Sequence, residues 1–500
     1  MRPCFSSPAS GNPTPSLPRF RALALLLLSL AGLLMPGCAG SRRSADLRAI
    51  YDQAAQNIGA DRNPVIVIPG ILGTKLESET TMRPVWGSFT YGAADPDTPE
   101  GARLVALPME PGTPLADIRD DVIPTTVLDT LALDVGLLRG VELGAYIDIL
   151  RTLAAGDYRD EMLGESGAID YGGLHYTCFQ FPYDWRRDVA EQAAALHDHV
   201  LAALAAQPVL EDDAKVDIVA HSMGGLVLRY YLRYGPTPMP EDGSLPELDW
   251  EGAQLVENAI LVGTPSAGSV LALEQLVEGV NFASLITPTY RPAVLGTMPA
   301  IYQLLPRTRH ARVIDRATGE AVDLYDPETW KAFGWGLADP NETGVLRDLL
   351  PDVESDEARR AIATDHLTKC LDAATRLHRA LDVPATPPPG LNMMLVAGDA
   401  HPTPDVVEVG TGGRLRVASR APGDNTVTRA SALMDERVGS GYAPRLRTPA
   451  RFASVVFLEA DHLGLTRDPL FTNVVLYTLL EKPKPAEEPS NERGAIEVGG

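Results

Sequence analysis

Closely spaced cysteines, clustered histidines and membrane-spanning apolar runs are all missing from this chain of 500 residues. The four cysteines stand far apart, at positions 4, 38, 178 and 370, and the nine histidines are scattered. Such spacing argues against the compact Cys/His ligand sets of zinc sites, so no metal or other cofactor is expected. Positions 178 and 370 could form a disulfide in an oxidising compartment, but the sequence does not decide this.

Positive charge is also in short supply. The chain has 43 Lys and Arg against 66 Asp and Glu, a formal net charge of −23. A surface this acidic is repelled by phosphate backbones, so nucleic acid is not expected as a partner. Anionic membrane surfaces would not attract the chain either. Any contact with lipid must therefore come from apolar surface or from a covalent anchor.

The N-terminal segment has the pattern of an export signal. Arg19 and Arg21 precede an apolar run over 22–35, which is too short to span a bilayer comfortably but suits a signal-peptide core. The run ends in Met-Pro-Gly-Cys-Ala-Gly (35–40), which resembles the bacterial lipoprotein cleavage box. We expect a cleaved signal peptide over 1–37, a lipidated Cys38 and a tether over 38–62. Because no Asp follows Cys38, an outer-membrane lipoprotein is predicted, with a periplasmic or secreted protein as the alternative.

Short β-branched runs alternate with helical patterns in the rest of the chain, which predicts a mainly parallel sheet covered by helices. Strands are expected at 64–68, 174–181, 216–220, 259–262, 392–397 and 454–458. Helices are expected at 189–206, 223–234 and 468–480. Two long stretches, about 74–170 and 266–385, break this rhythm, and we interpret them as cap insertions. The Pro- and Glu-rich tail, 482–500, is expected to be disordered.

The strongest chemical signal is Ala-His-Ser-Met-Gly-Gly at 220–225, placed between a predicted strand and a predicted helix. A serine on such a turn exposes its Oγ at the N-terminus of the helix. Small residues two before and two after it are needed because the turn brings their α-carbons against backbone. The pattern predicts Ser222 as a nucleophile, with the helix dipole and the Met223 amide stabilising the oxyanion that forms on attack.

A nucleophilic serine needs a base, an acid that orients the base, and a second oxyanion donor. His462 lies between a predicted strand and the closing helix, where the chain order serine, acid, histidine places the base. Two loop residues, Asp424 and Asp399, compete for the role of the acid. The segment Pro-Gly-Ile-Leu-Gly (69–73) directly follows the first strand, so the Ile71 amide is the candidate second donor.

These motifs resemble those of the lecithin:cholesterol acyltransferase and lysosomal phospholipase A2 family, in particular its bacterial members. The matching segments follow the family's order across most of 63–481: 64–77, 85–87, Phe-Pro-Tyr-Asp-Trp-Arg (181–186), 220–225, Gly-Thr-Pro (263–265), 298–306, Gly-Asp-Asn-Thr-Val (423–427) and 461–469. The resemblance implies an α/β-hydrolase domain over 63–481 with cap insertions. In that family the aspartate of Gly-Asp-x-Thr-Val is the triad acid, which favours Asp424.

The resemblance has limits that matter for specificity. Vertebrate members have a cysteine-closed loop near the first insertion, whereas this chain has no cysteine between 39 and 177. Sterol or lipoprotein recognition is therefore not carried over. The segment 183–186 is expected to buttress the sheet edge rather than to take part in catalysis.

The sequence thus predicts acyl transfer from a lipid or another acyl ester through an acyl-serine intermediate, with Ser222, Asp424 and His462 as the triad. Water or a lipid alcohol accepts the acyl group, and the sequence does not separate hydrolysis from transfer. It also leaves the oligomeric state open. The alternative is a catalytically silent, lipid-binding surface lipoprotein. The predicted contacts of the acyl chain in the cap are Trp86, Tyr302 and Leu304.

Overall fold

The computed structural model describes residues 62–89, 92–128, 131–135, 138–141, 144–173, 175–207, 214–281, 288–437 and 443–482. The predicted signal peptide, Cys38, the tether up to residue 61 and the tail from 483 lie outside these residues. Within the described part of the chain, no helix is long and apolar enough to cross a membrane.

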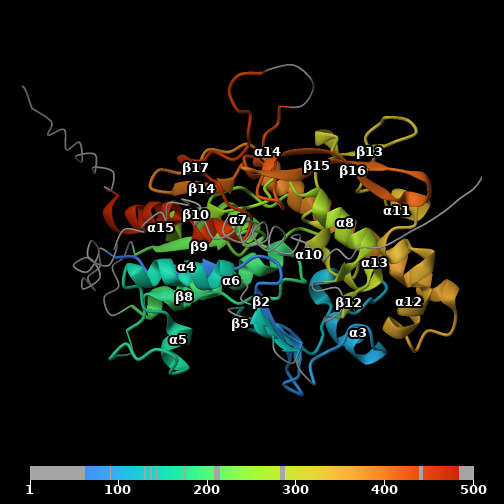
Figure 1. Cartoon of the computed structure of the whole chain (residues 1–500), viewed down its shortest axis with the longest axis horizontal. Coiled ribbons are helices and arrows are strands. Elements are labelled where there is room, and N and C mark those ends of the chain that lie inside the picture. The colour runs from blue at the N-terminus through green and yellow to red at the C-terminus, as the bar shows by residue number, and fades with distance from the viewer. Residues whose placement is uncertain are drawn as a thin grey trace, which may run out of the picture. The chain divides into compact units, whose positions relative to one another are not determined.

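A six-stranded sheet lies at the centre of the described residues, in the order β17-β14-β10-β9-β1-β8 (Figure 1). Every neighbouring pair in it is parallel. Each of the six strands coincides with or overlaps a predicted one, and the predicted α/β-hydrolase fold class is confirmed. The strands are β1 (Val65–Ile68), β8 (Cys178–Gln180), β9 (Val216–His221), β10 (Val256–Val262), β14 (Asn392–Gly398) and β17 (Ser454–Leu458).

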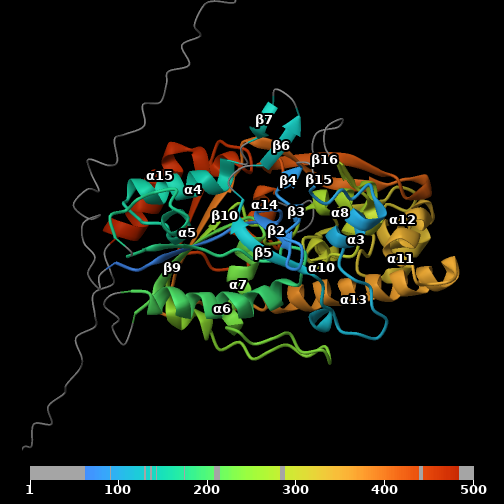
Figure 2. The same cartoon turned by 90° about the horizontal axis from the view of Figure 1, so that it is seen from below.

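Helices cover both faces of this sheet, as Figure 2 shows. Strand side chains point alternately to the two faces, and β1 is fully buried on both. Val65 and Val67 pack in one apolar cluster with α4 (Gly144–Ala155) and α15 (Pro469–Leu476). Ile66 and Ile68 pack in another with α6 (Val189–Ala205) and α7 (Gly224–Tyr234). Burial on both faces explains why the strands appear in the sequence as continuous apolar runs.

The first insertion builds small sheets beside the central one. A three-stranded antiparallel sheet has the order β3-β2-β5, and β4, β6 and β7 form another. The helix α4 lies inside the stretch predicted as a cap, yet its Ile149 and Leu153 pack against the central sheet. This part of the stretch therefore helps to cover the central sheet. The further elements here are β2 (Thr74–Ser78), β3 (Pro84–Trp86), β4 (Ser88–Phe89), α3 (Pro99–Val105), η1 (Leu115–Asp117), β5 (Val122–Val127), β6 (Leu131–Val135), β7 (Leu138–Val141) and α5 (Glu161–Glu165).

The second insertion is mainly helical, and its α11, α12 and α13 lie at the right in Figure 1. Its long helix α13 begins at a Ser355 cap and packs its apolar stripe into the larger core cluster. A short helix, η2 (Gly252–Leu255), precedes β10. The elements of the second insertion are α8 (Val270–Glu278), β11 (Val280–Asn281), β12 (Thr289–Tyr290), α9 (Pro292–Leu295), α10 (Pro299–Tyr302), η3 (Thr308–His310), β13 (Val313–Asp315), α11 (Pro327–Phe333), η4 (Gly336–Ala338), η5 (Pro340–Glu342), α12 (Thr343–Leu349) and α13 (Asp356–Asp382).

The C-terminal part of the chain forms a hairpin outside the central sheet before it adds a strand to that sheet. A hairpin joins β13 in a separate three-stranded sheet of order β13-β15-β16, and the chain then forms β17 and its closing helix. The elements are β15 (His401–Val409), η6 (Thr411–Gly413), β16 (Leu415–Gly423), α14 (Arg429–Ala432), η7 (Gly464–Arg467) and η8 (Tyr477–Glu481), which continues α15.

Candidate active site

The turn at Ser222 joins β9 directly to α7. Ser222 has a φ of +54°, the left-handed region, and its amide donates to the Val262 carbonyl at 2.7 Å. A side chain at Gly224 would place its Cβ 2.4 Å from the Pro69 carbonyl oxygen. A Cβ at Gly225 would lie 1.9 Å from Thr264 Oγ1. These contacts give a steric reason for glycine at positions 224 and 225.

His462 lies in the loop after β17, close to Ser222. Its Nε2 is 2.9 Å from Ser222 Oγ, and its Nδ1 is 2.8 Å from Asp424 Oδ2. The backbone adds a further bond, because the His462 amide donates to the Asp424 carbonyl at 2.8 Å. Gly263 has a φ of +59° and faces the imidazole, so that a Cβ there would lie 3.1 Å from two ring atoms. The imidazole is thus held by hydrogen bonds at both ring nitrogens and by contact with Gly263 on one side.

Asp424 is 1% exposed, at the end of β16. Its Oδ1 accepts the amides of Thr426 and Val427 at 2.9 and 2.6 Å. Burial by itself raises the pKa of Asp424, but His462 and these two amides outweigh it and leave the pKa below its usual value. The structure therefore brings an ionised carboxylate to His462, and that carboxylate belongs to Asp424 and not to Asp399.

The turn after β1 lies beside Ser222, as the sequence predicted. A Cβ on Gly70 would be 2.7 Å from Ser222 Cβ and 3.3 Å from its Oγ. The Gly73 amide donates to the Gly70 carbonyl at 3.0 Å, and Leu72 takes a positive φ of +64° to close the turn. Ile71 sits in this turn and is half-buried. Met223 follows Ser222 and opens α7 in helical conformation. That the amides of Ile71 and Met223 bind an oxyanion remains a prediction.

His221 is a site residue that the sequence reasoning missed. Its ring packs 4.8 Å from that of His462 and 5.6 Å from that of Tyr146, centroid to centroid. Burial lowers the pKa of His221 to about 3, so the ring is neutral. Its Nε2 lies 3.1 Å from the His462 carbonyl and donates to it. Only the position of His221 next to the serine pointed to it in the sequence.

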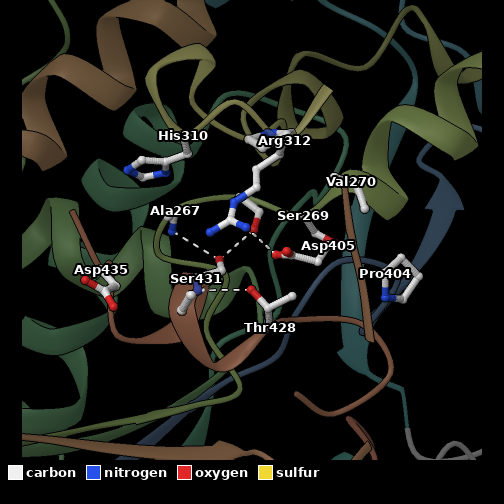
Figure 3. A pocket seen from close by; sticks show the side chains of 13 residues that line it. Ala267, Ser269, Val270, His310, Arg312, Pro404, Asp405, Thr428, Ser431 and Asp435 are labelled. Atoms are coloured by element: carbon white, nitrogen blue, oxygen red, sulfur yellow. Dashed lines mark hydrogen bonds and ion pairs between the residues drawn. The ribbon is translucent and has the colours of Figure 1, made fainter. Parts of the chain in front are cut away.

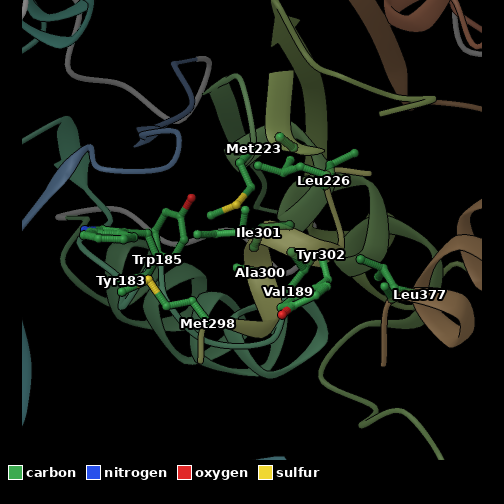
Figure 4. Close-up of a cluster of buried hydrophobic side chains, with 14 of the residues drawn as sticks. Tyr183, Trp185, Val189, Met223, Leu226, Met298, Ala300, Ile301, Tyr302 and Leu377 are labelled. Atoms are coloured by element: carbon green, nitrogen blue, oxygen red, sulfur yellow. The ribbon is translucent and has the colours of Figure 1, made fainter. Parts of the chain in front are cut away.

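The predicted acyl-chain contacts lie in packed surroundings. Trp86 is 3% exposed, and its indole N–H donates at 2.7 Å to the carbonyl of Leu72, which lies in the same turn as Ile71. Tyr302 has no exposed surface and donates to the Gly296 carbonyl at 3.0 Å. Figure 4 shows it among other buried side chains of the core. Leu304 is 7% exposed. Contact of these three with a substrate stays a prediction.

A small polar pocket lies beside the loop that carries Asp424, and Figure 3 shows its lining. Arg312 Nη1 pairs with Asp405 at 2.5 Å there, and Ser431 Oγ donates to the Gly268 carbonyl at 2.5 Å. Neither Ser222 nor His462 lines it. Residues of α14, β15 and the second insertion line the pocket.

Neither grouped metal ligands nor a disulfide occurs among the described residues. Among the described residues, no three His, Cys, Asp or Glu side chains are grouped so that they could hold a metal ion. Cys178 and Cys370 are both free and buried, so the disulfide left open by the sequence is not formed in this structure. The Cys178 thiol instead donates to Asp160 Oδ2 at 3.4 Å.

Known proteins resemble this chain at the level of family and fold. Residues 168–325 match the family model described as lecithin:cholesterol acyltransferase. A chain of the Tle4–Tli4 complex is similar at 16% identity and a TM-score of 0.51, over 84% of this chain and 98% of that one. No curated protein sequence matches.

Two other solved structures are more distant. Phospholipase PlaB from Legionella pneumophila has 14% identity over 69% of this chain and 58% of that one, with a TM-score of 0.31. Mature lipase BlEst2 from Bacillus licheniformis has 12% identity over 85% of this chain and 94% of that one, also with a TM-score of 0.31. The likeness to the Tle4–Tli4 chain shows the fold alone.

Proposed function

We propose, from the premise that this chain is an α/β-hydrolase similar to the lecithin:cholesterol acyltransferase family, that it transfers acyl groups from lipid esters through an acyl-serine intermediate. The observation that carries the proposal is the hydrogen-bonded series Asp424–His462–Ser222, with distances of 2.8 and 2.9 Å. A histidine between a buried carboxylate and a serine hydroxyl is the arrangement that activates serine for nucleophilic attack.

The first half of the proposed reaction forms the acyl-enzyme. Nδ1–H of His462 donates to Asp424, which leaves Nε2 free to accept the Ser222 proton. Ser222 Oγ then attacks the ester carbonyl carbon and forms a tetrahedral oxyanion. When the intermediate collapses, the bond to the alcohol oxygen breaks, and Nε2–H returns its proton to that oxygen. The alcohol leaves, and the acyl group remains on Ser222.

The second half releases the acyl group by the same steps in reverse. His462 Nε2 takes a proton from an acceptor hydroxyl, either water or a lipid alcohol, whose oxygen attacks the acyl-serine carbonyl. In both halves the amides of Ile71 and Met223 donate to the oxyanion, and the N-terminus of α7 adds a favourable dipole. The negative charge of Asp424 stabilises the imidazolium that forms on the way.

We propose a lipid ester as the substrate because of the family resemblance and because Ile71 and Met223, which lie beside Ser222, belong to the larger apolar cluster of the core. A covalent anchor at Cys38 would bring the enzyme to a bacterial envelope membrane that its net charge of −23 cannot bind electrostatically. An assay on a labelled phospholipid, with and without an added lipid alcohol, measures free fatty acid against acylated alcohol and so separates hydrolysis from transfer.

The direct test of the mechanism is Ser222→Ala, assayed on p-nitrophenyl butyrate. Loss of a triad nucleophile typically costs on the order of 10⁶ in turnover, so activity should fall to background while the unfolding temperature stays near that of the wild type. A variant that retains activity within a few-fold would contradict the proposal. Wild-type protein that binds lipid but never turns over esters would favour the silent lipid-binding lipoprotein instead.

A further inference from the structure

Two buried phenol groups hold a single peptide unit next to Ser222. Tyr183 Oη donates to the Pro69 carbonyl at 2.9 Å, and the Gly70 amide donates to Tyr146 Oη at 3.0 Å. The carbonyl of Pro69 and the N–H of Gly70 belong to the same peptide group, so both of its polar atoms are bound by tyrosine. This peptide leads directly into the turn that carries the proposed oxyanion donor.

The two tyrosines come from segments far apart in the sequence and are both rigidly placed. Tyr146 lies on α4 and is 4% exposed. It packs in an apolar cluster with Val127 and with Leu463, the residue that follows His462. Tyr183 is 1% exposed and follows β8. Its backbone amide donates to Thr74 Oγ1 at 3.2 Å, which ties it to β2. Neither ring can move without a rearrangement of the packing around it.

The clamped peptide controls the direction of the next one. The Gly70 carbonyl accepts the Gly73 amide inside the turn. Because the C=O and N–H of a trans peptide point in opposite directions, the N–H of Ile71, in the same peptide unit, points away from the turn interior. Rotation of the Pro69–Gly70 peptide would carry this N–H with it. Gly224 packs against the Pro69 carbonyl and blocks such a rotation on one side.

Burial keeps both phenols protonated. It raises the pKa of Tyr146 to about 12, with the Gly70 amide opposing the shift, and it raises the pKa of Tyr183 well above its usual value. A neutral phenol can donate to a carbonyl, as Tyr183 does, or accept an amide, as Tyr146 does. Neither group is therefore a proton-transfer residue at neutral pH, and both act as fixed hydrogen-bonding partners.

We propose that Tyr146 and Tyr183 are positioning residues that orient the Ile71 amide for the oxyanion. This inference rests on the proposed function. It extends the role of the segment 183–186 from support of the sheet to alignment of the oxyanion hole. It also means that the first insertion contributes to catalysis, because Tyr146 lies on α4. The benefit is confined to the tetrahedral state, because the ground-state carbonyl carries no full negative charge for the amide to bind.

Single-atom variants test this proposal. Tyr146→Phe and Tyr183→Phe remove only the hydroxyl groups and keep the packed rings. On p-nitrophenyl butyrate each should lower kcat by about 10- to 100-fold, the size of effect expected when a catalytic group is misplaced by a fraction of an ångström to an ångström. KM should change less than about threefold. The inhibition constant of 1-butaneboronic acid, which forms a tetrahedral adduct with serine, should rise in parallel with the loss of kcat.

Tyr230→Phe is the matched control. Tyr230 is also buried, and its hydroxyl donates to the Thr237 carbonyl at 2.9 Å, the same kind and length of bond as that of Tyr183 but outside the site. The three variants should lose similar amounts in unfolding temperature, whereas only the two site variants should lose kcat and boronate affinity. Equal kcat in all three would overturn the positioning role while leaving the mechanism intact. A wild-type enzyme with no Ser222-dependent turnover would instead overturn the proposed function, and this inference with it.

Discussion

At the scale of single residues, the backbone at Ser222 is strained and is closely packed against its neighbours. A non-glycine residue held in the left-handed region costs on the order of 1–3 kcal/mol, and Ser222 is such a residue. Its bond to Val262 and the close approach of Gly224 to Pro69 hold the turn in this conformation. The result is a hydroxyl group that lies 2.9 Å from His462 Nε2.

Gly263→Ala should separate the position of the base from the stability of the fold. The new methyl group would lie 3.0 Å from Leu465 Cδ1 and 3.1 Å from His462 Cε1 and Nδ1, and the residue would keep a positive φ. The imidazole must then shift from Ser222, and we expect kcat to fall by about 10- to 100-fold. Gly319→Ala is the control, because Gly319 has a φ of +75° but nothing within 4 Å of the added methyl group.

Both glycine variants should lose about 1–2 kcal/mol of stability from backbone strain, measured by urea unfolding. Only Gly263→Ala should lose activity on p-nitrophenyl butyrate. Equal activity of the two variants would mean that the imidazole does not depend on this contact.

The sequence pointed to Ser222, His462 and Asp424, which the structure brings together, better than to the residues that hold them. Ser222, His462 and Asp424 each carry a local signal, since a nucleophile turn, a post-strand histidine and a Gly-Asp turn are all short motifs. His221 and Tyr146 act through ring packing across segments far apart in the chain. Such contacts depend on how α4 lies on the sheet, and no local pattern encodes that. The packing of Tyr302 in the core was unpredictable for the same reason, because an apolar stretch in an insertion does not show whether it lines a pocket or fills the core.

At the scale of elements, the buried carboxyl group of Asp217 on β9 accepts hydrogen bonds from Asn258 on β10 and from Asn63, which precedes β1. Asp217 on β9 is 1% exposed. Its Oδ1 accepts the amide of Asn258 at 3.0 Å, the side-chain N–H of Asn258 at 2.7 Å and that of Asn63 at 3.3 Å. Burial, with Glu257 as a smaller contributor, raises the pKa of Asp217 to about 7 despite these donors. All three bonds go to one oxygen, which suits a protonated carboxyl group.

Asp217→Asn should therefore change the pH dependence of stability. An unfolded aspartate titrates near pH 3.9, so between about pH 4 and 7 the folded wild type binds more protons than the unfolded chain. The stability contributed by Asp217 is fully present below that window and is lost as the pH rises through 7. Asparagine keeps the accepting oxygen and carries no charge. The difference in unfolding free energy, variant minus wild type, should rise by about 2–3 kcal/mol from pH 5 to pH 7 and then level off.

Urea unfolding of both proteins at pH 5, 6, 7 and 8 measures this difference directly. A difference that stays constant across the series would show that Asp217 titrates alike in the folded and unfolded chains. A difference that falls with pH would show that its carboxylate is stabilised by the fold rather than destabilised.

The elements themselves were largely predictable, and the exceptions have a common cause. All six central strands and the helices α6, α7 and α15 follow from runs of buried β-branched residues and from helical spacing. The helix α4 was assigned to a cap because it lies in a long stretch without that rhythm. Its apolar face packs on the sheet through Ile149 and Leu153. Sequence spacing shows that such a face exists but not which surface it covers.

At the scale of the whole molecule, an acidic chain with an apolar core must reach a lipid by some means other than charge. We predict that mature protein isolated from cell envelopes begins at Cys38 with a diacylglycerol-modified thiol. Several acyl chains would hold it firmly, whereas one chain gives only marginal binding. Mass spectrometry of the N-terminal peptide measures this. An unmodified N-terminus at another residue would mean a periplasmic or secreted enzyme.

The central claim is that Ser222 is a nucleophile activated by His462 and Asp424, and covalent capture tests it most directly. Wild-type protein should react with a fluorophosphonate to give one adduct, located by peptide mass spectrometry on Ser222. Asp424→Asn should slow this reaction by several orders of magnitude, as expected when the imidazole is left in the wrong tautomer, and Asp399→Asn should leave it nearly unchanged. An unlabelled wild-type protein, or an adduct that persists in Ser222→Ala, would contradict the account.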